Sequence, residues 1–131
     1  MKEISILLPS LRPESLARSI REFENTNSNI DYEIIVVSPY EVKANNLIWV
    51  KEMIPLGSVL ATELAYKYSN SDYVMYFSDD VSPTENCLKN MLEFMKKQDN
   101  SLCLGAFKMI TNSGKEIGPF GAYNKFYACY G

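Results

Sequence analysis

Near its N-terminus the chain reads ISILLPSLRPESL over residues 4–16, and this stretch decides the fold. Its opening run, ISILL, is compact and apolar, which is typical of a strand buried on both faces. The run stops at a Pro-Ser step, and Pro13 then stands where the first residue of a helix is expected. Leu16, Ile20 and Phe23 follow at helical spacing. The stretch therefore predicts a buried strand, a polar loop and an amphipathic helix in succession.

The same alternation continues along the rest of the chain. Short runs rich in β-branched and aromatic residues predict further strands at Tyr32–Val37, Ile48–Val50, Tyr73–Phe77 and Leu102–Ile110. Helical spacing predicts two further helices, whose apolar faces carry Leu60, Leu64 and Tyr68 in the first and Leu88, Met91, Leu92 and Met95 in the second. Strands that alternate with helices indicate an α/β fold, with a mostly parallel sheet and helices on both faces.

Local signals also predict where the two later helices begin. Gly57-Ser58 opens the first of them, with Ser58 as its N-cap. The segment Ser82-Pro83-Thr84-Glu85 has the form of a capping box before the second. Ser82 is therefore predicted to cap that helix, with Glu85 reaching back to the Ser82 amide.

The composition is that of one ordinary globular domain, which we expect to span residues 1–131. A net charge of −3 gives no basic footprint for a phosphate backbone, so nucleic acid is not an expected partner. The chain has no histidine and only three cysteines, which excludes a histidine-dependent triad. No signal peptide and no apolar run of the ~18 residues needed for a membrane span is present. We expect a cytoplasmic protein, with a peripheral position at the inner face of the membrane as an alternative.

Polar residues follow three of the predicted strands, at Pro9-Ser10-Leu11-Arg12, at Ser38-Pro39-Tyr40-Glu41 and at Ser78-Asp79-Asp80. Ligands of open α/β sheets bind outside the carboxyl ends of the strands, so these segments are the candidate site. The adjacent carboxylates of Asp79 and Asp80 repel each other unless a hard cation such as Mg²⁺ or Mn²⁺ is bound. The plainer alternative is that both aspartates only form the turn after the strand, and that Arg12 is a solvated loop residue.

Two of these stretches together resemble glycosyltransferase family 2. The opening strand with its Pro-Ser step resembles the family's N-terminus, and residues 71–83, SDYVMYFSDDVSP, resemble its metal motif. The resemblance covers about the first 100 residues and implies a GT-A fold, which is a Rossmann-like sheet that binds a nucleoside diphosphate sugar. It implies that Asp80 ligates a divalent metal, Mn²⁺ or Mg²⁺, together with Asp79, which also reaches the ribose or the donor sugar. By the same resemblance Pro9, Ser10 and Arg12 line the nucleotide pocket.

Ser38 stands where family members usually carry an acid that contacts the base or the ribose, so it is expected to line the same pocket. The implied function is metal-dependent transfer of a sugar, with a UDP-sugar as the favoured donor and a glycan or lipid-linked molecule as the acceptor. Cell-surface polysaccharide biosynthesis is the implied role. The alternative is a domain of the same fold that binds a nucleotide sugar without transferring it.

No catalytic base is recognised in the sequence, and Glu116 is the only acid after Ile110. Transfer needs a base that deprotonates the acceptor hydroxyl. We therefore expect the chain to stop before an acceptor-binding half and to be inactive alone. An aromatic patch of Phe126, Tyr127 and Tyr130 predicts self-association.

Overall fold

The structure is a computed structural model that describes residues 1–98 and 109–117. It divides into two compact units, Met1–Cys87 and Leu88–Gly131, which are described separately below. The organisation of residues 1–131 as one domain stays a prediction. Within the two described ranges, no helix combines the length and the apolar character needed to cross a membrane.

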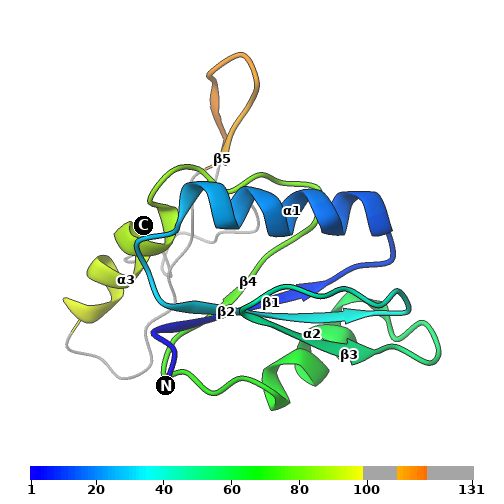
Figure 1. Ribbon diagram of the computed structural model, residues 1–131. Coiled ribbons are helices and arrows are strands. Elements are labelled where there is room, and N and C mark those ends of the chain that lie inside the picture. The colour runs from blue at the N-terminus through cyan, green and yellow to red at the C-terminus, as the bar shows by residue number, and fades with distance from the viewer. Residues whose placement is uncertain (99–108, 118–131) are drawn as a thin grey trace. The chain divides into compact units, whose positions relative to one another are not determined.

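The first unit is a parallel sheet between two helices (Figure 1). Its strands are β1 (Ile4–Pro9), β2 (Tyr32–Ser38), β3 (Leu47–Lys51) and β4 (Val74–Tyr76), in the spatial order β3-β2-β1-β4. All three pairings are parallel. Helix α1 (Pro13–Thr26) covers one face of the sheet, and helix α2 (Gly57–Lys67) covers the other. The predicted α/β class, the parallel sheet and the helices on both faces are confirmed.

Successive side chains of the central strands point to opposite faces of the sheet, one face toward α2 and the other toward α1. On one face Leu7, Ile35 and Val37 form a buried cluster with Ala61 and Ala65 of α2. Because the side-chain period of a strand is two, the neighbours of these residues point to the opposite face, which α1 covers. The sheet is therefore buried on both sides, which explains why its strands are continuous apolar runs.

Phe23 is the centre of packing on the α1 face. Its side chain is fully buried, and its ring meets Phe77 edge-on with the centroids 4.7 Å apart. The ring of Tyr32 lies 6.2 Å away on the other side. Phe23 thus ties α1 both to the start of β2 and to the end of β4, as its place on the predicted apolar face requires.

Helix α2 begins at the predicted residue, but of its predicted apolar face only Leu64 packs against the core, while Leu60 and Tyr68 are exposed. Gly57 has φ +78°, a conformation that glycine adopts without strain, and the helix starts there. Ser58 lies inside the helix and makes no cap, so that prediction is wrong. The buried side chains are Ala61 and Ala65, whereas Leu60 is 54% exposed. The small alanines let the helix backbone approach the sheet closely, which larger side chains at the same positions would prevent.

The predicted capping box before the third helix is also wrong. Helix α3 spans Cys87–Lys96, and Ser82 lies in the loop before it. Asn86 has φ 59°, which a right-handed helix cannot contain, and its amide donates to the Thr26 carbonyl at 3.0 Å. This hydrogen bond to the end of α1 keeps residues 82–86 in a loop, so α3 begins only at Cys87.

The second unit contains most of α3 and a short antiparallel hairpin. Leu88, Met91 and Leu92 are buried, as the helical spacing predicts. The hairpin pairs β5 (Met109–Ile110) with β6 (Glu116–Ile117). Of the strand predicted at Leu102–Ile110, only β5 lies within the described residues. The aromatic patch of Phe126, Tyr127 and Tyr130 lies outside them, and its role in self-association stays a prediction.

Candidate functional site

The strand order creates a switch point between β1 and β4. From β1 the chain crosses through α1 to β2 on one side, whereas β4 lies on the other side of β1. In open α/β sheets such a reversal leaves a crevice outside the carboxyl ends of the two strands, and ligands bind there. Ser10 follows β1 and Asp79 follows β4 by a few residues, so both lie at this crevice.

Backbone hydrogen bonds hold the two strand ends in place. The Ser10 amide donates to the Val37 carbonyl at 3.0 Å, which continues the β1–β2 ladder past Pro9. The Phe77 amide donates to the Leu7 carbonyl at 3.0 Å, which continues the β1–β4 ladder in the same way. The residues that leave these strands therefore start from fixed positions at one edge of the sheet.

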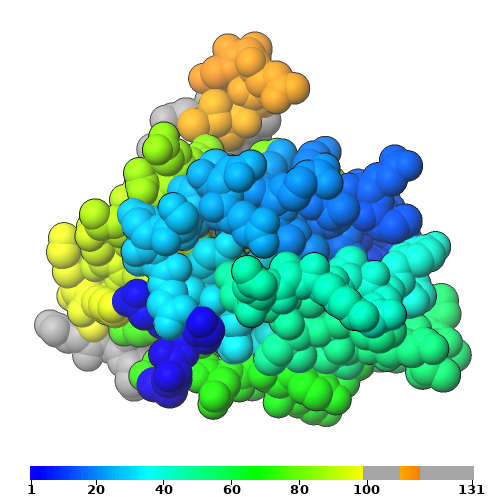
Figure 2. Space-filling model, viewed as in Figure 1, coloured from blue at the N-terminus to red at the C-terminus, as the bar shows by residue number. Residues whose placement is uncertain are grey.

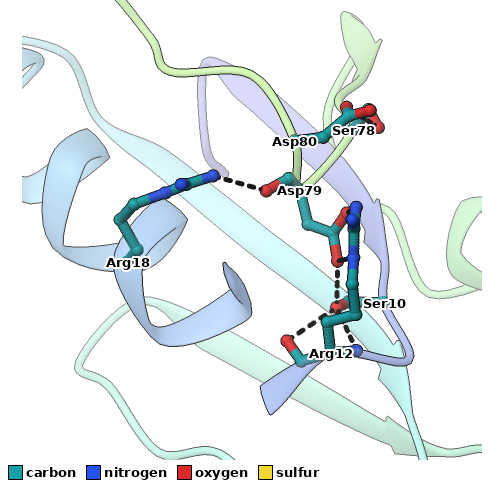
Figure 3. A network of polar contacts seen from close by, with 6 residues as sticks. All are labelled: Ser10, Arg12, Arg18, Ser78, Asp79 and Asp80. Carbon is teal, nitrogen blue, oxygen red and sulfur yellow. Dashed lines mark hydrogen bonds and ion pairs between the residues drawn. The ribbon is translucent and has the colours of Figure 1, made fainter. Parts of the chain in front are cut away.

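Asp79 is the centre of the polar network at this edge (Figure 3). Its side chain is nearly buried, and its Oδ2 accepts a hydrogen bond from the Ser10 hydroxyl at 2.5 Å. Arg12 binds the same carboxylate through both Nε, at 3.2 Å from Oδ2, and Nη2. The Arg12 amide also donates to Ser10 Oγ at 3.1 Å, which fixes the loop between the two side chains. Three residues predicted for the nucleotide pocket thus form one bonded group.

Arg18 is a further member of the network that the sequence did not single out. It lies on α1, and its Nη2 donates to the backbone carbonyl of Asp79 at 2.8 Å. In Figure 3 it reaches Asp79 from a different side than Arg12 does. The only signal in the sequence is its place early in the helix that follows β1, and that place alone does not distinguish a site residue from a solvated arginine.

The electrostatics of the group are those of a stable ion pair. Burial raises the pKa of Asp79, but hydrogen bonds from Arg12 and Ser10 and the positive charges of Arg12 and Arg18 outweigh burial, so the pKa is lowered overall. The hydrogen bond to Asp79 raises the pKa of Arg12. Asp79 is therefore ionised at neutral pH, and both of its carboxylate oxygens are engaged.

Asp80 has a different environment from its neighbour. It is exposed, and its Oδ1 accepts a hydrogen bond from the Ser78 hydroxyl. Figure 3 shows its side chain beside Ser78 and away from Ser10 and Arg12. Within residues 1–98 and 109–117, no three His, Cys, Asp or Glu side chains come together to hold a metal ion. A metal at this turn would therefore depend on Asp80, with other ligands supplied from outside the group.

Ser38 and Pro9 lie beside the network without joining it. Ser38 is fully buried at the end of β2, and its hydroxyl accepts a hydrogen bond from the Tyr40 amide at 3.1 Å. Its carbonyl accepts from the Trp49 indole N–H at 3.0 Å. These bonds shape the loop after β2. Pro9 is the last residue of β1 and pairs in register with Val37. A contact of either residue with a nucleotide stays a prediction.

A separate groove of about 330 Å³ runs along α1 beside the connection between β2 and β3. Figure 2 shows these two segments, coloured blue and cyan to teal, next to each other on one face of the first unit. The α1 residues that line the groove are Ala17, Ile20, Arg21 and Glu24. None of the residues that line the groove belongs to the Asp79 network, so the groove is a separate feature.

No model of a known protein family matches the sequence, and no curated protein matches it. A solved structure does: the crystal structure of S. aureus TarS 1-349 matches with a TM-score of 0.70 and 15% sequence identity. The match covers 89% of this chain but only 38% of that chain, so this chain spans well under half of the matched structure. TarS is a glycosyltransferase of the GT-A type. The chain therefore has a Rossmann-like, glycosyltransferase-like fold.

Proposed function

We propose that this chain is the donor-binding part of a glycosyltransferase that transfers a sugar from a nucleoside diphosphate sugar to an acceptor. The observation that carries the proposal is the Ser10–Arg12–Asp79 group at the switch point of a glycosyltransferase-like sheet. A binding site is expected at this point of an open α/β sheet. The charged guanidinium of Arg12, more than half exposed, suits a phosphate-bearing ligand.

Only one of the two aspartates fits a divalent metal. The Asp79 carboxylate is already occupied by a cation, Arg12, and a metal would have to displace it. Asp80 is exposed at the turn, with the Ser78 hydroxyl beside it. Mg²⁺ and Mn²⁺ are commonly held by one or two carboxylates, with substrate phosphates and water completing the shell. We therefore assign the metal to Asp80, where it would neutralise charge that develops on the departing diphosphate.

The other residues of the site have distinct roles in this proposal. Asp79 and Ser10 hold Arg12 in one orientation, so little side-chain freedom is lost when a phosphate binds. Arg12 stabilises the negative charge of the diphosphate as the sugar leaves. Pro9 and Ser38, at the neighbouring strand ends, shape the wall for the nucleoside. UDP is the preferred nucleotide, and a glycan or lipid-linked hydroxyl is the acceptor.

A second candidate is binding of the nucleotide sugar without transfer. The observation that favours it is the state of Asp79, the buried acid of the network. A carboxylate with a lowered pKa and both oxygens engaged is a poor proton acceptor at neutral pH, so Asp79 does not supply the base that transfer needs. We assign no residue of this chain as that base.

Calorimetric titration with UDP and GDP, with and without Mn²⁺, tests the proposal. Mn²⁺ should tighten binding of the preferred nucleotide at least about tenfold, or about 1.4 kcal/mol. The variant Asp80→Asn should lose this gain. The matched control is Asp72→Asn, an exposed aspartate before β4, which should keep it.

The outcomes separate the candidates. If neither nucleotide binds under any condition, the proposal is wrong. If a nucleotide binds and Asp80→Asn keeps the Mn²⁺ gain, the metal assignment is wrong. Release of labelled sugar by the chain, to water or to a glycan acceptor panel, would exclude the second candidate.

A further inference from the structure

Two arginines meet at one aspartate in the first unit, and they use it differently. Arg12 donates two hydrogen bonds to the Asp79 carboxylate, through Nε and Nη2. Arg18 donates one hydrogen bond, from Nη2 to the Asp79 backbone carbonyl at 2.8 Å. Asp79 itself has a 7% exposed side chain, while the side chains of Arg12 and Arg18 are 57% and 44% exposed. The contacts thus anchor both arginines at a buried point while leaving much of each side chain in solvent.

Both guanidinium groups keep unused donors in this arrangement. A guanidinium has five N–H donors in a fixed plane. Arg12 uses Nε and one Nη2 hydrogen on Asp79, and Arg18 uses one Nη2 hydrogen on the carbonyl. Among the residues that the structure describes, several N–H groups of each arginine have no partner, so they can bind an anion. Because each side chain is already held, an anion meets donors that lose little further freedom.

The acids near the two arginines leave these donors open. Asp79 neutralises Arg12, but the carbonyl that Arg18 binds carries no net charge. The nearest acid to Arg18 is Glu22, whose Oε1 lies 3.9 Å from Arg18 Nε, at the limit of an ion pair. Asp80 is close enough to act on Arg12 electrostatically, although its side chain points to Ser78. Arg18 thus shares the charge of Asp79 with Arg12, and neither Glu22 nor Asp80 takes up a hydrogen-bond donor of either guanidinium.

We propose that Arg12 and Arg18, organised by Asp79, form a diphosphate-binding pair that works without a metal ion. Each arginine takes phosphate oxygens, and a metal at Asp80 adds to an affinity that the arginines already provide. Asp79 is then a positioning residue for the two cations and not a metal ligand. The identity of the ligand as a nucleoside diphosphate sugar rests on the proposed function above; the binding of a diphosphate group by the arginine pair does not.

The test is calorimetric titration of the whole chain with inorganic pyrophosphate and with UDP, both in EDTA. Wild type should bind each of them. Arg18→Gln is the decisive variant, because it removes the positive charge and keeps a polar, unbranched side chain. It should weaken pyrophosphate binding about tenfold, as expected for the loss of a charged hydrogen bond. Arg12→Gln should have a similar effect.

The matched control is Arg21→Gln on the same helix, because Arg21 lines the separate groove and makes no hydrogen bond to Asp79; this variant should bind pyrophosphate as wild type does. Thermal unfolding of each variant checks that the fold is kept. An Arg18→Gln variant with wild-type affinity would show that Arg18 only clamps the turn, and the inference would fall. Binding that appears only with Mn²⁺ would also overturn it, while leaving the proposed function intact. If pyrophosphate binds in EDTA but no nucleotide binds more tightly than pyrophosphate, the arginine pair is supported and the proposed function is wrong.

Discussion

A polar group lies at each end of the parallel sheet. Both groups have a serine bonded to an acid at their centre, but the residues around that pair differ. At the amino end the Ser5 hydroxyl donates to Glu33 Oε1 at 2.5 Å, and at the carboxyl end the Ser10 hydroxyl donates to Asp79 Oδ2 at 2.5 Å. Ser5 lies in β1 and Ser10 directly follows that strand, and both acids are nearly buried. Each end therefore has a serine, in β1 or directly after it, bonded to a nearly buried acid.

The remaining partners differ. The Asn70 amide donates to Glu33 at 3.1 Å, and Ser71 Oγ lies 2.8 Å from Ser5 Oγ. Since Ser5 gives its one hydroxyl hydrogen to Glu33, Ser71 is the donor to Ser5. In the described ranges no lysine or arginine forms an ion pair with Glu33, whereas Asp79 is held by Arg12. The amino-end group closes on itself and fixes the loop after α2. The carboxyl-end group presents cations to solvent, and this is the difference between a structural network and a candidate binding site.

The largest effect that separates the two ends is expected from Glu33→Ala. The change leaves the Ser5 hydroxyl, which is fully buried, and the Asn70 amide without their acceptor. It should lower the free energy of unfolding by about 3 kcal/mol, measured by urea denaturation. Pyrophosphate affinity should stay at the wild-type value. Glu63→Ala, at an exposed helical pair with Lys67, is the control and should change stability by less than about 0.5 kcal/mol. A loss below about 1 kcal/mol for Glu33→Ala would contradict a closed structural network.

Replacing the two serines compares the ends directly. Ser5→Ala leaves Glu33 with only the Asn70 amide among the partners described above, so unfolding should become easier by about 2 kcal/mol. Ser10→Ala leaves Arg12 on Asp79, so the loss should be about 1 kcal/mol. Only Ser10→Ala should also weaken pyrophosphate binding. A larger loss for Ser10→Ala than for Ser5→Ala would mean that the Arg12–Asp79 ion pair stabilises the fold less than the Ser10–Asp79 hydrogen bond does.

A smaller, pH-dependent effect is expected at the carboxyl end. The pKa of Asp79 is lowered in the folded state, so its stabilisation is present above the ordinary value of 3.8 and is lost as the pH falls through the lowered value. Asp79→Asn should therefore cost about 1 kcal/mol at pH 7, discounted because Arg12 is more than half exposed. The gap to wild type should shrink as the pH falls below 3.8. A gap that stays constant down to about pH 2 would show that the charge of Asp79 does not stabilise the fold.

Local pattern predicted much of the fold because local physics decides it. The apolar runs of β1 and β2, the helix start at Pro13 and the buried Phe23 all follow from spacing within a few residues. The failures have tertiary causes. Ser82 is no cap because Asn86 is bonded to the end of α1, and α2 turns its alanines to the sheet although larger apolar residues are available.

The sequence predicts where the candidate site lies, but not which of its residues bond to one another. Strand ends are readable from sequence, so Ser10, Arg12 and Asp79 were named together. Their bonds join segments more than 60 positions apart, and no local pattern reports which acid an arginine will meet. For the same reason the sequence predicts metal binding by both Asp79 and Asp80, although Asp79 is nearly buried against Arg12 and Asp80 is exposed. Arg18 was missed because its partner is a backbone carbonyl, which every residue offers.

The central position of β1 also has a consequence for how the protein folds. The Ser5–Glu33 bond closes a loop of 28 positions, while the Ser10–Asp79 bond closes one of 69. Loop-closure entropy grows with the logarithm of length, so the longer closure costs about 0.8 kcal/mol more. During synthesis β1, α1 and β2 also leave the ribosome before β4 does. We therefore expect docking of β4 to be the late step of folding, and the proposed diphosphate site is incomplete until that strand has docked.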